Sequence, residues 1–155
     1  MVTPDPATVA DRLALRDLVE SYAAAVDARD ADLLASLFTP GALLEVRRND
    51  GTGSRYEGAA ALPKLISALE ANYQKTFHLV GNHRVTLDGD RAAGDTYCLA
   101  HHVFADDEGV PSTMEMLVRY LDRYIRDDGD WLIDRRTVTY LWTRVTPVDA
   151  AGLGR

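Results

Sequence analysis

The chain has 155 residues, of which 46% are apolar and 26% charged, and a net charge of −7. This length fits one domain with its own hydrophobic core, and this composition excludes an intrinsically disordered chain. The negative charge argues against a nucleic-acid partner, which would need a basic face, and no apolar run approaches the roughly 18 residues of a membrane span.

The first third of the chain predicts helices. Residues 1–8 carry two prolines and no periodicity, so we expect a flexible arm, and the lack of a basic, apolar leader predicts a cytoplasmic location. Apolar side chains then recur at helical spacing from Asp11 to Asp27. Asp30 is a suitable N-cap for a second, short helix that ends at the TPG sequence of residues 39–41.

The rest of the chain predicts a sheet and one further helix. The ALLEV sequence at residues 42–46 is typical of a strand before an NDGTG hairpin turn, and residues 58–73 predict the third helix. Long strands joined by Asp- and Gly-rich turns follow at 77–87, 92–105, 112–126 and 131–144. The expected fold class is α+β, a cone-shaped barrel in which N-terminal helices pack on a curved, mostly antiparallel sheet that encloses a pocket. This domain should span residues 9–145, followed by a tail at 146–155.

Two neighbouring strands carry histidines that could share a face. Side chains alternate between the two faces of a strand, so only one of His101 and His102 can lie on the same face as His78. A two-residue turn within residues 88–90 places His101 beside or diagonal to His78. A three-residue turn would favour His102, and a bulge at Gly81 could shift the register. The register thus favours His101 and leaves the choice open.

Asp27 closes the sequence SYAAAVD, whose apolar residues indicate a buried neighbourhood. A buried carboxylate needs a partner, and a histidine is a natural one. A carboxylate bonded to one imidazole nitrogen fixes the tautomer and raises the basicity of the other nitrogen, which makes the histidine a general base near neutral pH. The alternative is a solvated aspartate at a helix end.

Aromatic and sulfur-containing side chains of the late strands are candidates for the pocket wall, namely Tyr97, Met116, Tyr120 and Trp142. Each of them could equally be a core residue, although Tyr120 could also offer its hydroxyl as a donor. The single cysteine, Cys98, excludes an internal disulfide, and the histidine spacing resembles no metal motif. We therefore expect neither a metal nor another cofactor.

The sequence resembles the SnoaL-like family of the nuclear transport factor 2-like superfamily over about residues 9–145. Three stretches carry the resemblance: YAAAVDARDADLLASLFTPGALLE, FHLVGNHRVTLDGDRAAGDTYCLAHH and YLDRYIRDDGDWLI. Within that superfamily the pattern is similar to those of bile acid 7α-dehydratase, scytalone dehydratase and hexachlorocyclohexane dehydrochlorinase. The fold also hosts isomerases, cyclases and non-catalytic binders, so the resemblance identifies the fold better than the reaction.

The resemblance implies roles for four residues. His78 matches the histidine base of these enzymes, Asp27 matches the aspartate paired with it, Tyr22 matches a catalytic tyrosine, and His101 matches a second catalytic position. The implied function is a cofactor-independent lyase or isomerase that performs a dehydratase-type elimination on an apolar polycyclic, polyketide, steroid or terpenoid-like molecule. The alternative is a non-catalytic small-molecule-binding or accessory protein of the same fold.

Departures from the family pattern narrow the choice of substrate and of reaction. Val46 and Tyr120 stand where scytalone dehydratase has a pocket tyrosine and an asparagine, which argues against scytalone as the substrate. An epoxide hydrolase of this fold would need Asp122 to converge with Arg119 or Arg136, and strand parity separates Asp122 from Arg119. A homodimer or homotrimer is expected, because the exposed face of such a sheet usually needs cover.

Overall fold

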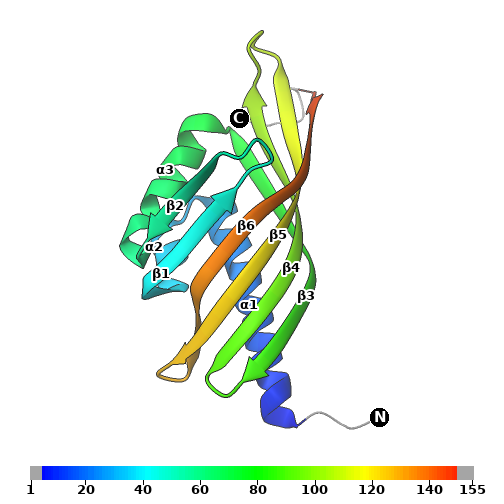
Figure 1. The fold of residues 1–155 in the computed structure, drawn as a ribbon. Helices are drawn as coiled ribbons and strands as arrows, with labels where there is room; N and C mark the ends of the chain where they lie inside the picture. The colour runs from blue at the N-terminus through cyan, green and yellow to red at the C-terminus, as the bar shows by residue number, and fades with distance from the viewer. Residues whose placement is uncertain (1–4, 150–155) are drawn as a thin grey trace.

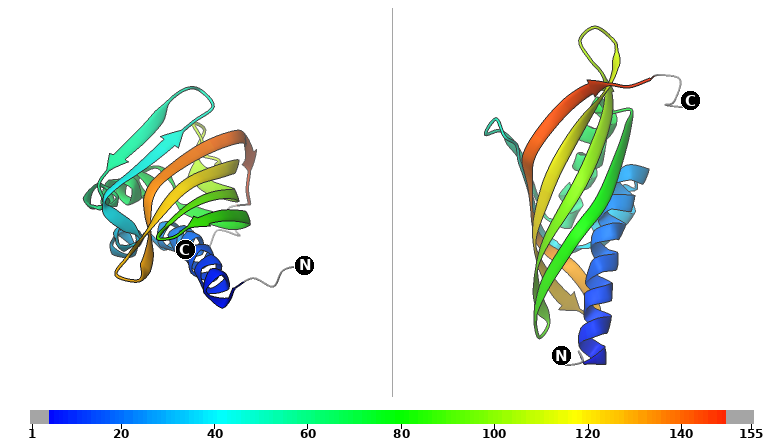
Figure 2. Two further views of the ribbon diagram at one scale, coloured as in Figure 1. Left: turned by 60° about the horizontal axis from the view of Figure 1, so that its bottom comes forward. Right: turned by 90° about the vertical axis from the view of Figure 1, so that its right-hand side faces the viewer.

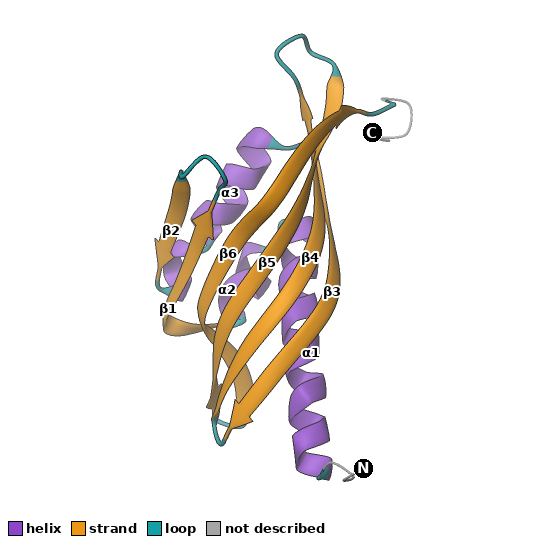
Figure 3. Ribbon diagram, turned by 45° about the vertical axis from the view of Figure 1, so that its right-hand side comes forward, coloured by secondary structure: helices purple, strands orange, loops and turns teal. Residues whose placement is uncertain are grey.

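The computed structural model describes residues 5–149, which form three α-helices, one short 3-10 helix and one six-stranded sheet (Figure 1). In chain order the elements are α1 (Pro6–Ala28), α2 (Ala31–Ser36), β1 (Phe38–Arg47), β2 (Gly53–Glu57), η1 (Ala59–Ala61), α3 (Pro63–Asn72), β3 (Lys75–Asp88), β4 (Arg91–Ala105), β5 (Pro111–Asp127) and β6 (Asp130–Pro147). The expected α+β class is confirmed, with helices packed on a curved sheet (Figure 3). No helix among the described residues is long and apolar enough to span a membrane.

The sheet has the strand order β2-β1-β6-β5-β4-β3. The strands from β3 to β6 form the expected antiparallel meander. β1 pairs in parallel with β6, which the sequence does not predict, because the two strands are far apart in the chain and share no turn. The sheet curls around α1, which runs beside β3, while α3 lies behind β1 and β2 (Figures 1 and 2). One side of the curl is therefore bounded by α1 and the other by α3.

The break between α1 and α2 sets the position of Asp27. α1 ends at Ala28, and its C-cap residue Arg29 adopts the left-handed conformation with a φ of 60°. Asp30 then caps α2 by accepting a hydrogen bond from the N–H of Leu33 at 2.8 Å. The chain turns sharply between the two helices. Asp27 thus lies in the last turn of α1, where it reaches β3.

Both ends of the folded region extend beyond the expected bounds of residues 9–145. α1 already begins at Pro6, with the Asp5 carboxylate as its N-cap, because a proline is well tolerated at the first helical position. β6 continues to Pro147. The N–H of Val148 donates to the carbonyl oxygen of Pro111 at 2.9 Å, and residues 1–4 of the predicted arm and 150–155 of the predicted tail lie outside the described residues.

The register between β3 and β4 changes once along the two strands. Near the turn, Asp88 pairs with Arg91 across a two-residue loop, and this register continues to the pair of His83 and Thr96. An extra residue between Val80 and His83 then shifts the pairing by one. This irregularity is a β-bulge, which leaves the two halves of β3 with opposite facing patterns relative to β4.

The bulge decides which histidine faces inward. Beyond it, His78 lies opposite Ala100 rather than His101. His78 and His102 therefore share the inner face of the sheet, and His101 lies on the outer face. The expected register, which placed His101 beside His78, is wrong because of the extra residue in β3, although the turn has the expected length.

Hydrogen bonds connect the bulge to α1. Arg16 donates hydrogen bonds to the carbonyl oxygens of Gly81 and Val80, at 2.6 and 3.1 Å. These bonds satisfy backbone acceptors where the ladder is interrupted. Arg16 also pairs with Glu20 one turn later in α1, at 2.6 Å.

The outer face of the sheet carries exposed apolar side chains, which are 39% to 56% exposed at Phe77, Leu79, Tyr97, Leu121 and Trp142. The prediction that Tyr97 and Trp142 line the pocket is therefore wrong, because their strand registers turn both side chains outward. A homodimer or homotrimer that buries this face stays a prediction.

An ion pair fills the core at the end of the sheet near the β5–β6 turn. Arg136 donates to both carboxylate oxygens of Asp122, at 2.8 and 2.7 Å, and Tyr124 donates to the same carboxylate at 2.7 Å. Neither charged side chain is exposed. The guanidinium carbon of Arg136 lies 4.1 Å from the ring centre of Tyr22 and 4.6 Å from that of Tyr120. The pair thus supports two aromatic rings as well as neutralising its own charges.

Candidate active site

A cavity of about 270 Å³ lies between the inner face of the sheet, the C-terminal half of α1, α3 and the β1–β2 hairpin. Apolar and aromatic side chains make up most of its wall. Its polar side chains include imidazoles on β3 and β4, one arginine and several tyrosines. Among the residues expected to form the site, Tyr22, His78, Met116 and Tyr120 line this cavity.

Asp27 and His78 form a close pair at one end of the cavity. The Nδ1 of His78 lies 2.7 Å from Oδ1 of Asp27, and the backbone N–H of His78 donates to Oδ2 at 2.9 Å. The His78 side chain is 8% exposed, and the Asp27 side chain behind it is 25% exposed. An ionised Asp27 requires Nδ1 to carry the proton, so Nε2 is left as the free acceptor of the ring.

Two further side chains hold Asp27 in place. The hydroxyl of Thr76 donates to Oδ1 of Asp27 at 2.8 Å and accepts a hydrogen bond from Arg29 at 2.7 Å. Burial raises the pKa of Asp27, but the hydrogen bonds and charge of His78 and the hydroxyl of Thr76 outweigh it, so the pKa lies below its usual range. Asp27 is therefore ionised at neutral pH.

His102 is the second imidazole of the cavity wall. It is only 4% exposed, and its ring centre lies 5.4 Å from that of His78 and 4.5 Å from that of Tyr73. Neither of its ring nitrogens has a hydrogen-bond partner within the part of the chain that the structure describes. Buried polar groups are usually paired, so this imidazole is available to a ligand in the cavity.

His102 is neutral in the folded protein. Burial, reinforced by the charges of His78 and Arg29, lowers its pKa to about 3. A neutral imidazole offers one N–H donor and one acceptor. His102 can thus hydrogen-bond a ligand without carrying a charge into the cavity.

This neutral state predicts a loss of stability in acid. Between about pH 6.5 and about pH 3, the unfolded chain holds a proton on His102 that the folded chain lacks, so the free energy of unfolding falls as the pH falls through this window. His102→Phe should flatten the slope by up to one proton, or about 1.4 kcal/mol per pH unit. Urea midpoints at pH 7.5 and pH 5.0 measure the effect, with His101→Phe as the matched outward-facing control. Equal slopes in wild type and His102→Phe would contradict the assignment.

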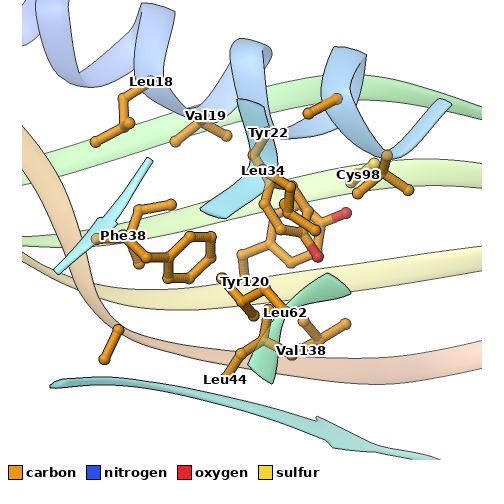
Figure 4. Close-up of a cluster of buried hydrophobic side chains, with 14 of the residues drawn as sticks. Leu18, Val19, Tyr22, Leu34, Phe38, Leu44, Leu62, Cys98, Tyr120 and Val138 are labelled. Atoms are coloured by element: carbon orange, nitrogen blue, oxygen red, sulfur yellow. The ribbon is translucent and has the colours of Figure 1, made fainter. Parts of the chain in front are cut away.

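Tyr22 and Tyr120 supply hydroxyl groups to the cavity wall. Their rings meet edge to face at 5.8 Å, one from α1 and one from β5 (Figure 4). Burial raises the pKa of Tyr22 to about 12 although Arg136 acts in the opposite direction, and burial raises the pKa of Tyr120 well above its usual value. Both phenols keep their protons and can act only as neutral hydrogen-bond partners at physiological pH.

Asp122 and Arg136 converge, as an epoxide hydrolase would require, but they do not line the cavity. Their guanidinium–carboxylate contact is enclosed behind Tyr22 and Tyr120. Arg119, the other candidate, pairs instead with Asp95 at 2.6 Å. This arrangement gives the ion pair a supporting place in the core.

The prediction did not include Tyr73, Tyr140 and Arg48 of the wall, and it kept His102 only as the alternative to His101. A glycine within a strand pattern often marks a bulge, and Gly81 is the signal that could have selected His102. The other three residues gave no local signal, since their positions depend on how distant elements pack. Among residues 5–149, no group of three or more His, Cys, Asp or Glu side chains is arranged to hold a metal ion.

Comparisons with known proteins agree with this architecture. The family model of the SnoaL-like domain matches residues 7–137. An uncharacterized protein of Mycobacterium tuberculosis is 32% identical over 133 residues, which cover 86% of this chain and 87% of that protein.

Solved structures show the same fold. A hexachlorocyclohexane dehydrochlorinase from Novosphingobium barchaimii has a TM-score of 0.77 at 22% identity, covering 92% of this chain and 93% of that chain. A protein from Novosphingobium aromaticivorans, proposed to be an aromatic ring hydroxylase, has a TM-score of 0.76 at 26% identity, covering 95% and 96%. These likenesses extend over nearly the whole folded region.

Proposed function

Because the chain belongs to the SnoaL-like family, we propose that it is a cofactor-independent lyase or isomerase that transfers a proton in the cavity beside His78. The observation that carries the proposal is the 2.7 Å pair of Asp27 and His78 at the cavity wall. A binding protein would need neither group, and a partly buried ionised carboxylate is costly to keep without a use. The likeness in fold to a dehydrochlorinase supports elimination chemistry.

The first step is removal of a proton from carbon. Nε2 of His78 accepts a proton from a carbon next to a carbonyl or similar activating group, and the electron pair of the broken C–H bond moves toward that group. The resulting imidazolium is stabilised by the ionised Asp27. Tyr22 and Tyr120 donate hydrogen bonds to the oxygen on which negative charge develops, which contributes a few kcal/mol in a dry pocket.

The second step is departure of the leaving group. The electron pair forms the carbon–carbon double bond, and a hydroxyl on the neighbouring carbon leaves with its bonding electrons. His102 donates a hydrogen bond to this hydroxyl, but a neutral imidazole does not readily give up its proton. The proton that His78 took from carbon therefore passes to the leaving oxygen, which departs as water and returns the pair to its starting state. The hydrogen and the hydroxyl must then leave from the same side of the substrate.

The volume of the cavity indicates the size of the substrate. A cavity of about 270 Å³ lies near the lower end of small-molecule sites, so as it stands it suits a monocyclic or bicyclic molecule better than a steroid. Val46 and Tyr120, where the sequence departs from scytalone dehydratase, both line the cavity. This supports a substrate other than scytalone.

The role of Asp27 supplies the test of the proposal. In Asp27→Asn the tautomer of His78 is no longer fixed by a carboxylate, so we expect a loss of about 10- to 100-fold in turnover, as is usual for orienting partners. Turnover is measured as solvent-deuterium uptake and dehydration with a panel of monocyclic and bicyclic β-hydroxy ketones. Asp17→Asn, which alters an exposed aspartate on the same helix, is the control.

Two outcomes would count against the enzyme. If Asp27→Asn and Asp17→Asn had the same activity as the wild type, the pair would have no part in the reaction. If the wild type bound members of the panel but exchanged no deuterium into them, the non-catalytic alternative would be favoured.

A further inference from the structure

Arg48 lines the cavity at the β1–β2 hairpin, across the sheet from the strands that carry the imidazoles. It directly follows β1, and four strand spacings of the sheet separate β1 from β3, which carries His78. At about 4.8 Å per spacing, the two strands are roughly 19 Å apart measured across the curved sheet. Among the described residues that line the cavity, Arg48 is the single lysine or arginine.

The guanidinium of Arg48 has no carboxylate partner within 4.0 Å among residues 5–149. Its guanidinium donates a 3.3 Å hydrogen bond to the hydroxyl of Ser54 and also interacts with the hydroxyl of Tyr140. The Asp50 carboxylate accepts its hydrogen bonds from the hydroxyl and the N–H of Thr52, at 2.6 and 2.8 Å. These bonds, helped by the charge of Arg48, lower the pKa of Asp50. The neighbouring Arg47 is paired, at 3.1 Å from Glu45. Arg48 thus differs from Arg47 in keeping its charge available.

Two tyrosines share the cavity wall with Arg48. Tyr140 on β6 and Tyr73 at the C-cap of α3 line the same cavity as Arg48. Tyr73 also packs against His102, with ring centres 4.5 Å apart. Burial raises the pKa of both phenols, and the positive charge of Arg48 acts in the opposite direction. Both phenols remain protonated and can donate hydrogen bonds.

We propose that the substrate carries a carboxylate, which binds Arg48, Tyr73 and Tyr140 while the carbon that loses its proton lies beside His78. These three side chains combine a forked guanidinium with phenol donors, the combination that suits a planar, monoanionic acceptor. A single cation balances one negative charge, so a dianionic phosphate fits less well. The chain as a whole has a net charge of −7, so an anionic substrate needs this local positive charge.

The inference deepens the proposed function, because it takes the same cavity as the substrate site. It assigns the two ends of the cavity different tasks. The Asp27–His78 end performs the proton transfer, and the Arg48 end orients an apolar acid by its charged group. Neutral molecules of the same shape should bind less well.

A matched pair of probes tests the charge preference directly. Isothermal titration calorimetry compares 1-naphthylacetate with the neutral 1-naphthylacetamide in wild type, Arg48→Met, Arg48→Lys and Arg47→Met. The wild type should bind the acetate about 10-fold or more tightly than the amide. Arg48→Met should lose that preference with little change toward the amide, Arg48→Lys should keep part of it, and Arg47→Met should behave as the wild type does.

Several results would overturn the inference. They are equal affinities of the wild type for acetate and amide, an equal loss in Arg47→Met and Arg48→Met, and no binding of either probe at millimolar concentration. Because the readout is binding, it separates the two proposals. A protein that selects the acetate through Arg48 but never exchanges a carbon-bound proton would support this inference and contradict the proposed function.

Discussion

Replacing His78 with glutamine is expected to lower kcat by about 10²- to 10⁴-fold, the usual contribution of a general base. Glutamine can still donate a hydrogen bond to Asp27, but its amide cannot accept a proton from carbon as Nε2 does. Binding of the substrate should change much less than turnover, because the apolar wall stays intact. The measurement is kcat and KM for a β-hydroxy ketone that the wild type converts.

The His78→Gln result needs two comparisons. His101→Gln changes the neighbouring outer-face histidine and should leave kcat within about twofold of the wild type, since the register turns that side chain away from the cavity. The double variant of Asp27→Asn and His78→Gln should be no slower than His78→Gln alone, because groups that act as a unit are not additive. Additive losses would show that the two residues act separately.

Replacing Arg136 with methionine is expected to destabilise the fold by about 3 to 5 kcal/mol. The change removes the partner of Asp122, whose carboxylate is fully enclosed, and leaves its negative charge in the core. It also removes the cation that lies against the rings of Tyr22 and Tyr120. Urea unfolding at pH 7.5 measures the loss as a change in the midpoint at constant slope.

Arg119→Met is the matched control for this experiment. Arg119 makes the same two-pronged contact with Asp95, at 2.8 and 2.6 Å, but both side chains are more than a third exposed on the outer face. Exposed pairs contribute about 0 to 1 kcal/mol, so Arg119→Met should have a small effect. Replacing Arg136 and Asp122 together by Met and Leu should recover much of the stability, since no unpaired charge remains. Equal effects of Arg119→Met and Arg136→Met would contradict the role of burial.

The fold was largely predictable because its signals are local. Turn residues separate the four long strands, and helical periodicity ends at the two aspartates that close α1 and open α2. The parallel contact of β1 with β6 was not predictable, since it joins segments about 90 residues apart without a shared turn. The pairing completes the sheet that supports the cavity.

The candidate site was predictable only where chemistry and pattern coincided. Asp27 and His78 were expected as a pair from the family resemblance and from the apolar residues before Asp27, and the structure places them in contact. The prediction favoured His101 over His102. One extra residue in β3 inverts the facing pattern beyond it, so His102 faces the cavity instead. Arg48 was not predicted as a site residue, because a cation after a strand is usually solvated. Its importance depends on having no carboxylate within 4.0 Å among residues 5–149.

Hydrogen bonds at two points along α1 connect this helix to β3 and hold one wall of the cavity in place. Arg16 holds the bulge, and Asp27 holds the strand start, about 16 Å further along the helix at 1.5 Å per residue. Among residues 5–149, no side chain of α3 itself makes a hydrogen bond to the sheet, although Tyr73 at its C-cap packs on His102 and Phe104 of β4. The wall formed by α1 and β3 is therefore tied together by hydrogen bonds at two separate points, which keeps the reacting groups aligned.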